Sequence, residues 1–545
     1  MKHARETTRD RKWLLVALRV AVVLSPLISV LIITAVTGTS LLALDAWNST
    51  WNDEHGYYWT INQMRLFGAP EGMTGYNEVP APRASYGSYS PFVYIPYMLG
   101  SFVTGLSTHN FMYLINICLG ILAALAVVLI ARPSKRQSAT IAAFFLFQFI
   151  VARYMVSGMT ETSYVLFAAL LASCAVWLVK HSRDNADVIT MRGAHVTNRA
   201  NAQAADAGAG TVAMLVAMIC IVCFWGMMRP YLLAYILVPC ALLIAGDFGL
   251  KRPVRIGLLA FSVVLALATL AGYLYFSKYY VTPYFHSASI ANSLTDRIAD
   301  ACAGLLTTNV KAITFSVKSL LKLDWLGIMA FTFAAFWVAL LVMAVRAGRR
   351  ERRTTCALLI SMVLAGFALY EANILLYTYW QLHRTLIATD VVYALLIICL
   401  IAPDAKKASA AIPGTALICV VCVLCIGALA VHPDEFCIPQ VDAAQDSAEQ
   451  AALSQKLADI IKHSDDAWDN TIAHPPEKDM KLYFYMPSYT ALNCCQKDYM
   501  KKALRKGTLS SKYVCLPLDS KLNKTARKRY DIVYKGMNHI LYQVR

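Results

Sequence analysis

The sequence predicts an all-α polytopic membrane protein with a small α/β domain at its C-terminal end. Of its 545 residues, 58% are hydrophobic and 15% are charged, whereas about 25% of the residues of a soluble domain are charged. The apolar residues gather in runs of the roughly 20 residues that a helix needs to cross a bilayer. The net charge of +17 does not indicate nucleic-acid binding, because most basic residues lie in short loops between these runs.

We expect about eleven transmembrane helices. Their predicted ranges are 13–37, 110–131, 138–152, 162–180, 211–228, 231–246, 255–277, 328–345, 355–377, 385–402 and 412–431. The first run follows the basic segment MKHARETTRDRK, and no small-residue cleavage site is obvious after it. This run is therefore expected to remain as a span and not to be removed as a signal peptide.

Basic residues alternate between the two sets of loops that join these spans. One set includes the N-terminal tail and a loop with five arginines between 346 and 353, whereas the short loops of the other set hold single basic residues such as Arg153. Cytoplasmic loops are the more basic ones in membrane proteins, so the N-terminus is predicted to be cytoplasmic and the C-terminus outside. We expect a multi-pass protein of the plasma membrane, with 45–109, 278–327 and 432–545 on its outer side.

Two of the outer segments are predicted to hold helices at the membrane surface. Pro91–Gly105 (PFVYIPYMLGSFVTG) is apolar but too short to span, which favours an interfacial or re-entrant helix. Residues 309–327 carry apolar side chains at helical spacing with lysines between them, which indicates a second surface helix.

The chain is expected to divide into a transmembrane domain at 1–431 and a soluble outer domain at 432–545. In the outer domain, 481–486, 531–536 and 539–545 predict strands, the last two joined by a tight turn, and 455–463 and 498–506 predict helices. Disulfides are permitted on this side of the membrane, and the sequence does not choose among the three pairings of Cys437, Cys494, Cys495 and Cys515.

Charged residues from distant parts of the chain share the predicted outer face. Asp53 and Glu54 lie in WNDEHGYYW just after the first span, and Glu161 precedes a later one. Arg229, His383 and Arg384 lie at the outer ends of other spans. An acceptor hydroxyl needs a carboxylate base, and a departing phosphate needs cationic donors. This set suits glycosyl transfer from a lipid phosphate at the bilayer surface.

The first span, the large outer loop with an early W-N-D-E-H and the later interfacial helix together resemble the GT-C class of membrane glycosyltransferases. Within that class, the chain is most similar to the protein O-mannosyltransferase and lipid A aminoarabinose transferase branch. The resemblance implies an inverting enzyme with a polyprenyl-phosphate sugar donor and an extracytoplasmic glycan, lipid or protein acceptor. It makes Asp53 the catalytic acidic residue, which serves as the base, with Glu54 beside it, and Glu161 a second acidic residue. His383–Arg384 is similar to a motif that contacts the lipid phosphate.

Further predictions concern the first outer loop and the cofactors. Arg83 and Tyr86 are expected to line the substrate cavity. Some members of the wider class hold a divalent cation with carboxylates, so such an ion is considered although no metal ligand is assigned. The aromatic residues around 47–59 are expected first of all to form a belt at the membrane interface.

Each of these residues also has a purely structural interpretation. Asp53 and Glu54 could cap the helix that follows them, Glu161 could begin a helix, and Arg229 could extend to the interface. His55 is expected to orient or pack and not to bind metal. Arg384 could equally anchor the topology.

The main alternative function is a membrane transporter or a flippase for lipid-linked saccharides. Transporters place ionisable residues near the bilayer midplane and often repeat their halves, whereas here the charges lie at span ends and no repeat is visible. An envelope polymer ligase is a third interpretation, but such proteins usually carry their large outer loop late in the chain. Eleven spans are also more than a simple membrane anchor needs.

Overall fold

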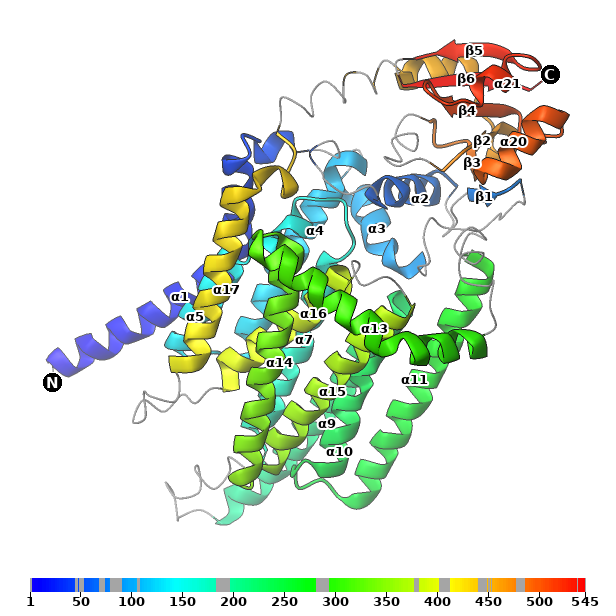
Figure 1. Cartoon of the computed structure of the whole chain (residues 1–545). Helices are drawn as coiled ribbons and strands as arrows, with labels where there is room; N and C mark the ends of the chain where they lie inside the picture. The colour runs from blue at the N-terminus through cyan, green and yellow to red at the C-terminus, as the bar shows by residue number, and fades with distance from the viewer. Residues whose placement is uncertain are drawn as a thin grey trace.

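The computed structural model contains a long helical bundle with a small sheet domain beyond one of its ends (Figure 1). The structure describes residues 2–44, 48, 53–67, 74–78, 91–104, 108–182, 197–280, 294–376, 382–400, 412–439, 448, 451, 453–476, 486–536 and 538–544.

Eight helices in the described residues are long and apolar enough to cross a membrane. They are α1 (Lys2–Val36), α4 (Thr108–Ala126, continued by η4, Val127–Ala131), α7 (Thr162–Lys180), α9 (Thr197–Met228), α11 (Arg252–Tyr280), α14 (Trp325–Arg349), α15 (Arg353–Leu376) and α17 (Ile412–Val431). Each coincides with a predicted span.

The other three predicted spans are bent or short. Helices α5 (Lys135–Phe147) and α6 (Phe149–Met155) meet at a bend of 62°, and together they make a ninth candidate span. The elements η5 (Pro230–Ile236) and α10 (Leu237–Ala245) form one short apolar segment, and α16 (Leu382–Leu400) provides the other. All eleven predicted runs are therefore helical in the described residues, and the predicted fold class is confirmed, with eight or at most nine of the runs long and apolar enough to span by themselves.

The two predicted surface helices are present. Helix α3 (Ile95–Thr104) follows the short turn η3 (Pro91–Val93) and is only 10 residues long. Helix α13 (Leu294–Leu321) packs against α14 and lies across one end of the bundle (Figure 1). Its exposed apolar residues Val310, Ile313 and Val317 are spaced by three and four, so they share one face. That face suits contact with lipid.

The C-terminal domain contains a six-stranded sheet in the described residues, with the strand order β1-β3-β2-β4-β6-β5. Its strands from the C-terminal tail are β2 (Thr471–His474), β3 (Ala491–Cys494), β4 (Tyr513–Pro517), β5 (Asp531–Lys535) and β6 (His539–Gln543), accompanied by α20 (Lys497–Lys506) and α21 (Asn523–Ala526). Strands β1 to β4 pair in parallel, and β6 runs antiparallel to β4 and β5. The predicted α/β class of this domain is confirmed.

Several predicted elements of this domain are present. The β5–β6 hairpin and α20 coincide with predicted segments, and residues 453–460 are helical and overlap the predicted helix at 455–463. The predicted strand at 481–486 lies outside the described residues apart from Met486. No disulfide joins the cysteines of the C-terminal segment, Cys437, Cys494, Cys495 and Cys515, in this structure.

One edge of the sheet comes from the segment between α2 (Asp53–Phe67) and α3, more than 390 residues earlier in the chain. Strand β1 (Thr74–Tyr76) pairs in parallel with β3, and Thr74 lies opposite Leu492. The carboxylate of Glu78 accepts hydrogen bonds from the backbone N–H groups of Ser510 and Ser511, at 2.9 and 2.7 Å. The loop that follows the candidate acids is thereby joined to the C-terminal domain.

A third contact of Glu78 comes from the Tyr499 hydroxyl, which donates at 3.2 Å. Burial and the neighbouring Glu78 carboxylate raise the pKa of Tyr499 to about 12, so this phenol remains a neutral donor at physiological pH. We expect Glu78→Ala to release β1 and to increase the hydrogen exchange of residues 74–76 by about 10- to 100-fold, since it removes several bonds to a charged group.

Mass spectrometry of exchange in the full chain measures this effect. Tyr499→Phe is the matched control, because it removes one contact of Glu78 and leaves the two backbone donors. Equal exchange of residues 74–76 in the native chain and in Glu78→Ala would show that Glu78 does not hold the strand.

Candidate active site

The two acids of the loop that is predicted to be the first outer one begin helix α2 (Asp53–Phe67). Carboxylates in the first turn of a helix are favoured by the partial positive charge of its N-terminus. Their environments differ: Glu54 is fully buried, whereas Asp53 is only half-buried. Glu54 Oε2 accepts a hydrogen bond from the backbone N–H of Gly158 at 2.6 Å. The side chain of Glu54 thus fixes the start of α2, while Asp53 keeps access to solvent.

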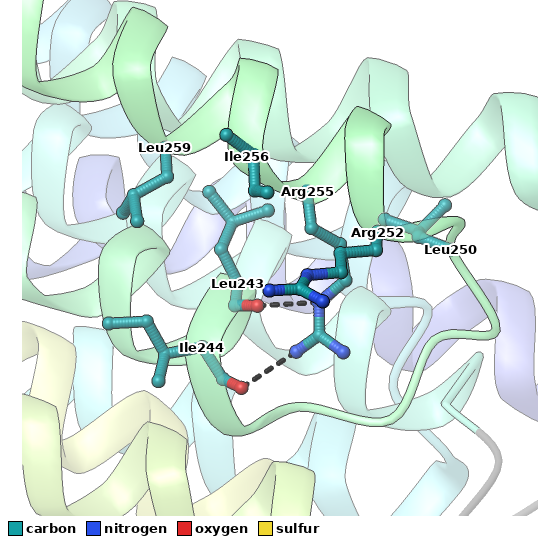
Figure 2. A pocket seen from close by; sticks show the side chains of 7 residues that line it. All are labelled: Leu243, Ile244, Leu250, Arg252, Arg255, Ile256 and Leu259. Carbon is teal, nitrogen blue, oxygen red and sulfur yellow. Dashed lines mark hydrogen bonds between the residues drawn. The ribbon is translucent and has the colours of Figure 1, made fainter.

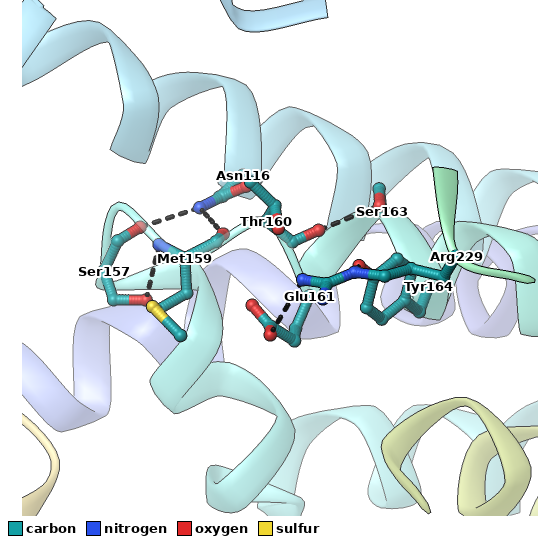
Figure 3. A network of polar contacts seen from close by, with 8 residues as sticks. All are labelled: Asn116, Ser157, Met159, Thr160, Glu161, Ser163, Tyr164 and Arg229. Carbon is teal, nitrogen blue, oxygen red and sulfur yellow. Dashed lines mark hydrogen bonds and ion pairs between the residues drawn. The ribbon is translucent and has the colours of Figure 1, made fainter. Parts of the chain in front are cut away.

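Gly158 lies in the turn that joins α6 to α7, and Asn116 of α4 holds this turn from another side (Figure 3). The Asn116 amide donates to the carbonyl oxygens of Ser157 at 2.7 Å and Met159 at 2.9 Å. Its own oxygen accepts a bond from the Tyr97 hydroxyl at 2.7 Å. Elements far apart in the chain therefore meet at one buried turn.

The same turn ends at Glu161, which forms a buried ion pair with Arg229 (Figure 3). Their nearest charged atoms are 3.5 Å apart, and the side chains are 2% and 3% exposed. Arg229 also donates through Nε to the Tyr164 hydroxyl. Burial of either charge alone is costly, so each one compensates the other. Glu161 also directly precedes the first residue of α7, which agrees with the structural interpretation that Glu161 begins a helix.

The aromatic residues of α2 are core residues. Tyr57, Tyr58 and Trp59 are at most 1% exposed, and the ring of Tyr57 lies 5.6 Å from that of Tyr94. The predicted interface belt is therefore wrong for these three, because α3 and α4 pack against α2 and bury them. Burial, together with the nearby Glu161 charge, raises the pKa of Tyr97 well above its ordinary value. Tyr97 is a neutral hydrogen-bond donor in this environment.

Arg153 takes part in a second polar contact. The sequence analysis used this residue only to predict the topology and did not predict the contact. Its guanidinium lies 4.1 Å from the ring centre of Trp325 and 5.9 Å from that of Phe436. Glu435, in the turn η8 (Pro433–Glu435), lies near the Arg153 guanidinium. The pKa of Glu435 is raised mainly by burial and to a smaller extent by the negative charge of Asp324. Arg153 thus holds together α6, the start of α14 and the segment after α17.

No protein-family model and no curated protein sequence matches this chain. Among solved structures, apo ArnT from Cupriavidus metallidurans is similar, with 12% identity and a TM-score of 0.50 over 95% of this chain and 97% of that one. The chain has a GT-C fold. ArnT bound to undecaprenyl phosphate gives 14% identity and a TM-score of 0.49 over 95% and 98% of the two chains. The Archaeoglobus fulgidus oligosaccharyltransferase in complex with Zn and sulfate gives 14% and 0.48 over 96% and 73%.

Within this GT-C fold, the structure brings together part of the predicted site. Glu54 contacts the turn that carries Glu161, and Glu161 pairs with Arg229. Arg83 and Tyr86 lie outside the described residues. His383 and Arg384 are in the first turn of α16, but the structure does not describe their side chains. It does not describe the side chain of His55 either. No three His, Cys, Asp or Glu side chains form a metal-binding cluster in the described part of the chain.

The contact between α2 and the turn at Gly158 is tight and leaves little room for a side chain. A Cβ on Gly158 would lie 3.0 Å from Glu54 Oε2 and 3.2 Å from the ring of Tyr58. We expect Gly158→Ala to lower the free energy of unfolding by about 1–3 kcal/mol, because it forces the start of α2 away. Thermal unfolding of the purified chain measures this loss.

Gly257→Ala in α11 is the matched control, since a Cβ there meets no atom within 4 Å. It should leave stability unchanged or raise it slightly, because alanine favours a helix more than glycine does. Equal effects of the two substitutions would contradict a tight contact at Gly158.

Proposed function

We propose that the chain is an inverting membrane glycosyltransferase with a polyprenyl-phosphate sugar as donor and an extracytoplasmic glycan, lipid or protein as acceptor. The observation that carries this proposal is the Glu54–Gly158 hydrogen bond in a GT-C fold, because it joins the Asp53–Glu54 pair to the turn with Glu161. The loop charges support a cytoplasmic N-terminus and an outer C-terminus in the plasma membrane.

Asp53 acts as the general base in this proposal. It is the more accessible of the two acids at the start of α2, and Glu54 holds that start in place. The acceptor oxygen attacks the anomeric carbon while Asp53 takes the hydroxyl proton. The bond from that carbon to the phosphate oxygen breaks, and the lipid phosphate leaves with the electron pair. Attack from the face opposite the phosphate inverts the anomeric carbon.

The departing phosphate needs a cation, and we assign this role first to Arg384, with His383 beside it. Arg229 is buried and bonded to Glu161 and Tyr164, which supports a positioning role for the Glu161–Arg229 pair. Arg229 could also meet the phosphate if this pair opens on donor binding. Arg83 and Tyr86 are proposed to line the sugar cavity, from the loop between β1 and α3.

A reconstitution experiment separates this proposal from the transporter or flippase alternative. The purified full chain is placed in vesicles with labelled polyprenyl-phosphate sugars, and both transfer to acceptors and movement of the lipid between leaflets are followed. Transfer that requires the chain supports the proposal. Lipid or solute movement without transfer from any donor would replace it by the alternative.

A further inference from the structure

A pocket of about 380 Å³ lies between the end of α10 and the start of α11 (Figure 2). It is lined by Leu243, Ile244, Leu250, Arg252, Arg255, Ile256 and Leu259. These helix ends lie at the end of the bundle away from the sheet domain (Figure 1). The pocket is therefore separate from the candidate active site, and the basic loop that borders it is predicted to be cytoplasmic.

Arg255 gives the pocket a fixed wall. Its guanidinium donates to the carbonyl oxygens of Leu243 at 2.7 Å and Ile244 at 2.8 Å (Figure 2). It also donates to the carbonyl oxygen of Gly246 at 3.2 Å. Carbonyl groups at the C-terminal end of a helix have no partner within the helix, so Arg255 satisfies the end of α10. This bonding ties the start of α11 to α10 and keeps the pocket formed.

Arg252 is the cation that remains for a ligand. It is the first residue of α11 and is exposed, and neither it nor Arg255 forms an ion pair in the part of the chain that the structure describes. Asp247 is the acidic residue of the connecting loop, and the loop is held by the bond from its backbone N–H to Thr354 Oγ1 at 2.9 Å. With Lys251 next to Arg252, basic residues outnumber acidic ones here.

The rest of the pocket is apolar and opens toward the lipid-facing side of the bundle. Ile244 and Ile256 are 68% and 57% exposed, as expected for side chains that meet acyl chains and not water. A ligand for this site must therefore combine an anionic group with a hydrocarbon chain.

We propose that this pocket binds an anionic glycerophospholipid of the inner leaflet. Its phosphate group lies at Arg252, where a guanidinium can donate two hydrogen bonds to phosphate oxygens. One acyl chain lies along Ile244, Ile256 and Leu259. Basic pockets between transmembrane helices on the cytoplasmic side recognise lipid head groups by this combination. The site is distinct from the donor site and does not depend on the transferase proposal.

Native mass spectrometry of the purified full chain tests the site. Dioleoyl phosphatidylglycerol, phosphatidylcholine and inorganic phosphate are titrated in parallel against the native chain, Arg252→Gln and Arg349→Gln. Arg349 is the matched control, since it is an exposed arginine at the cytoplasmic end of α14 that does not line the pocket.

We expect phosphatidylglycerol to bind the native chain and Arg349→Gln equally, and to bind Arg252→Gln about tenfold more weakly, because one charge-assisted contact is lost. Arg252→Lys should retain part of the affinity, which separates loss of charge from loss of fold. Equal binding of phosphatidylglycerol to the native chain and Arg252→Gln would overturn the proposal. Equal affinity for phosphatidylcholine, or displacement of the lipid by inorganic phosphate alone, would also overturn it.

Discussion

Asp53→Asn is expected to reduce the rate of sugar transfer about 10²- to 10⁴-fold, which is the usual contribution of a general base. Asparagine keeps the shape of the side chain but cannot take the proton of the acceptor hydroxyl. The fold should remain intact, because Asp53 is half-buried and the bond between Glu54 and Gly158 is unchanged. Initial rates of the purified chain at saturating donor measure the effect, and thermal unfolding checks the fold.

Two comparison variants make this result specific to Asp53. Asp434→Asn removes a carboxylate that is exposed, in η8, and should transfer at the native rate. Glu54→Gln replaces the acceptor of the Gly158 bond, and we expect it to lower stability and rate together. An Asp53→Asn chain that transfers as fast as the native one would remove Asp53 from the mechanism.

The second large effect is expected at the buried pair of Glu161 and Arg229. Arg229→Gln leaves the Glu161 carboxylate buried without its cation, which should lower the free energy of unfolding by about 3–5 kcal/mol. Glu161→Gln should have a similar cost, because Arg229 then loses the opposite charge. Denaturation of the purified chain in detergent measures both variants.

The double variant Glu161→Gln, Arg229→Gln distinguishes a true pair from two independent side chains. With neither charge buried, it should be more stable than the sum of the single losses implies, since neighbouring residues do not act additively. If the two losses simply add, the charges do not compensate each other, and the positioning role that we propose for Arg229 fails.

The hydrophobic pattern was enough to predict the architecture. A run such as 162–180 must be helical in a membrane, because lipid offers no partners to its backbone polar groups, and α7 occupies that range. The bend between α5 and α6 was beyond this reasoning, since it depends on a local break at Gln148 within an otherwise apolar run. Strand β1 was missed for a related reason: the three residues Thr74–Tyr76 carry no alternating pattern, and their partner strand is distant in the chain.

The candidate site was predictable in composition but not in geometry. The sequence indicated that Glu161 and Arg229 share one membrane face, yet only packing decides that they pair with each other. It also could not distinguish Asp53 from its neighbour, because burial of Glu54 depends on Gly158, more than a hundred residues later. Tyr57, Tyr58 and Trp59 are residue types that are typical of an interface belt. They are buried in the core instead, because α3 and α4 pack against α2.

The proposed reaction is tested most directly by the configuration of its product. Purified chain is mixed with one equivalent of a polyprenyl-phosphate sugar of known anomeric configuration and with an acceptor, and the product is analysed by NMR after a single turnover. Direct attack by an acceptor hydroxyl that Asp53 deprotonates predicts the opposite configuration in the product. Retention of the donor configuration would contradict this account, because it requires a covalent glycosyl intermediate.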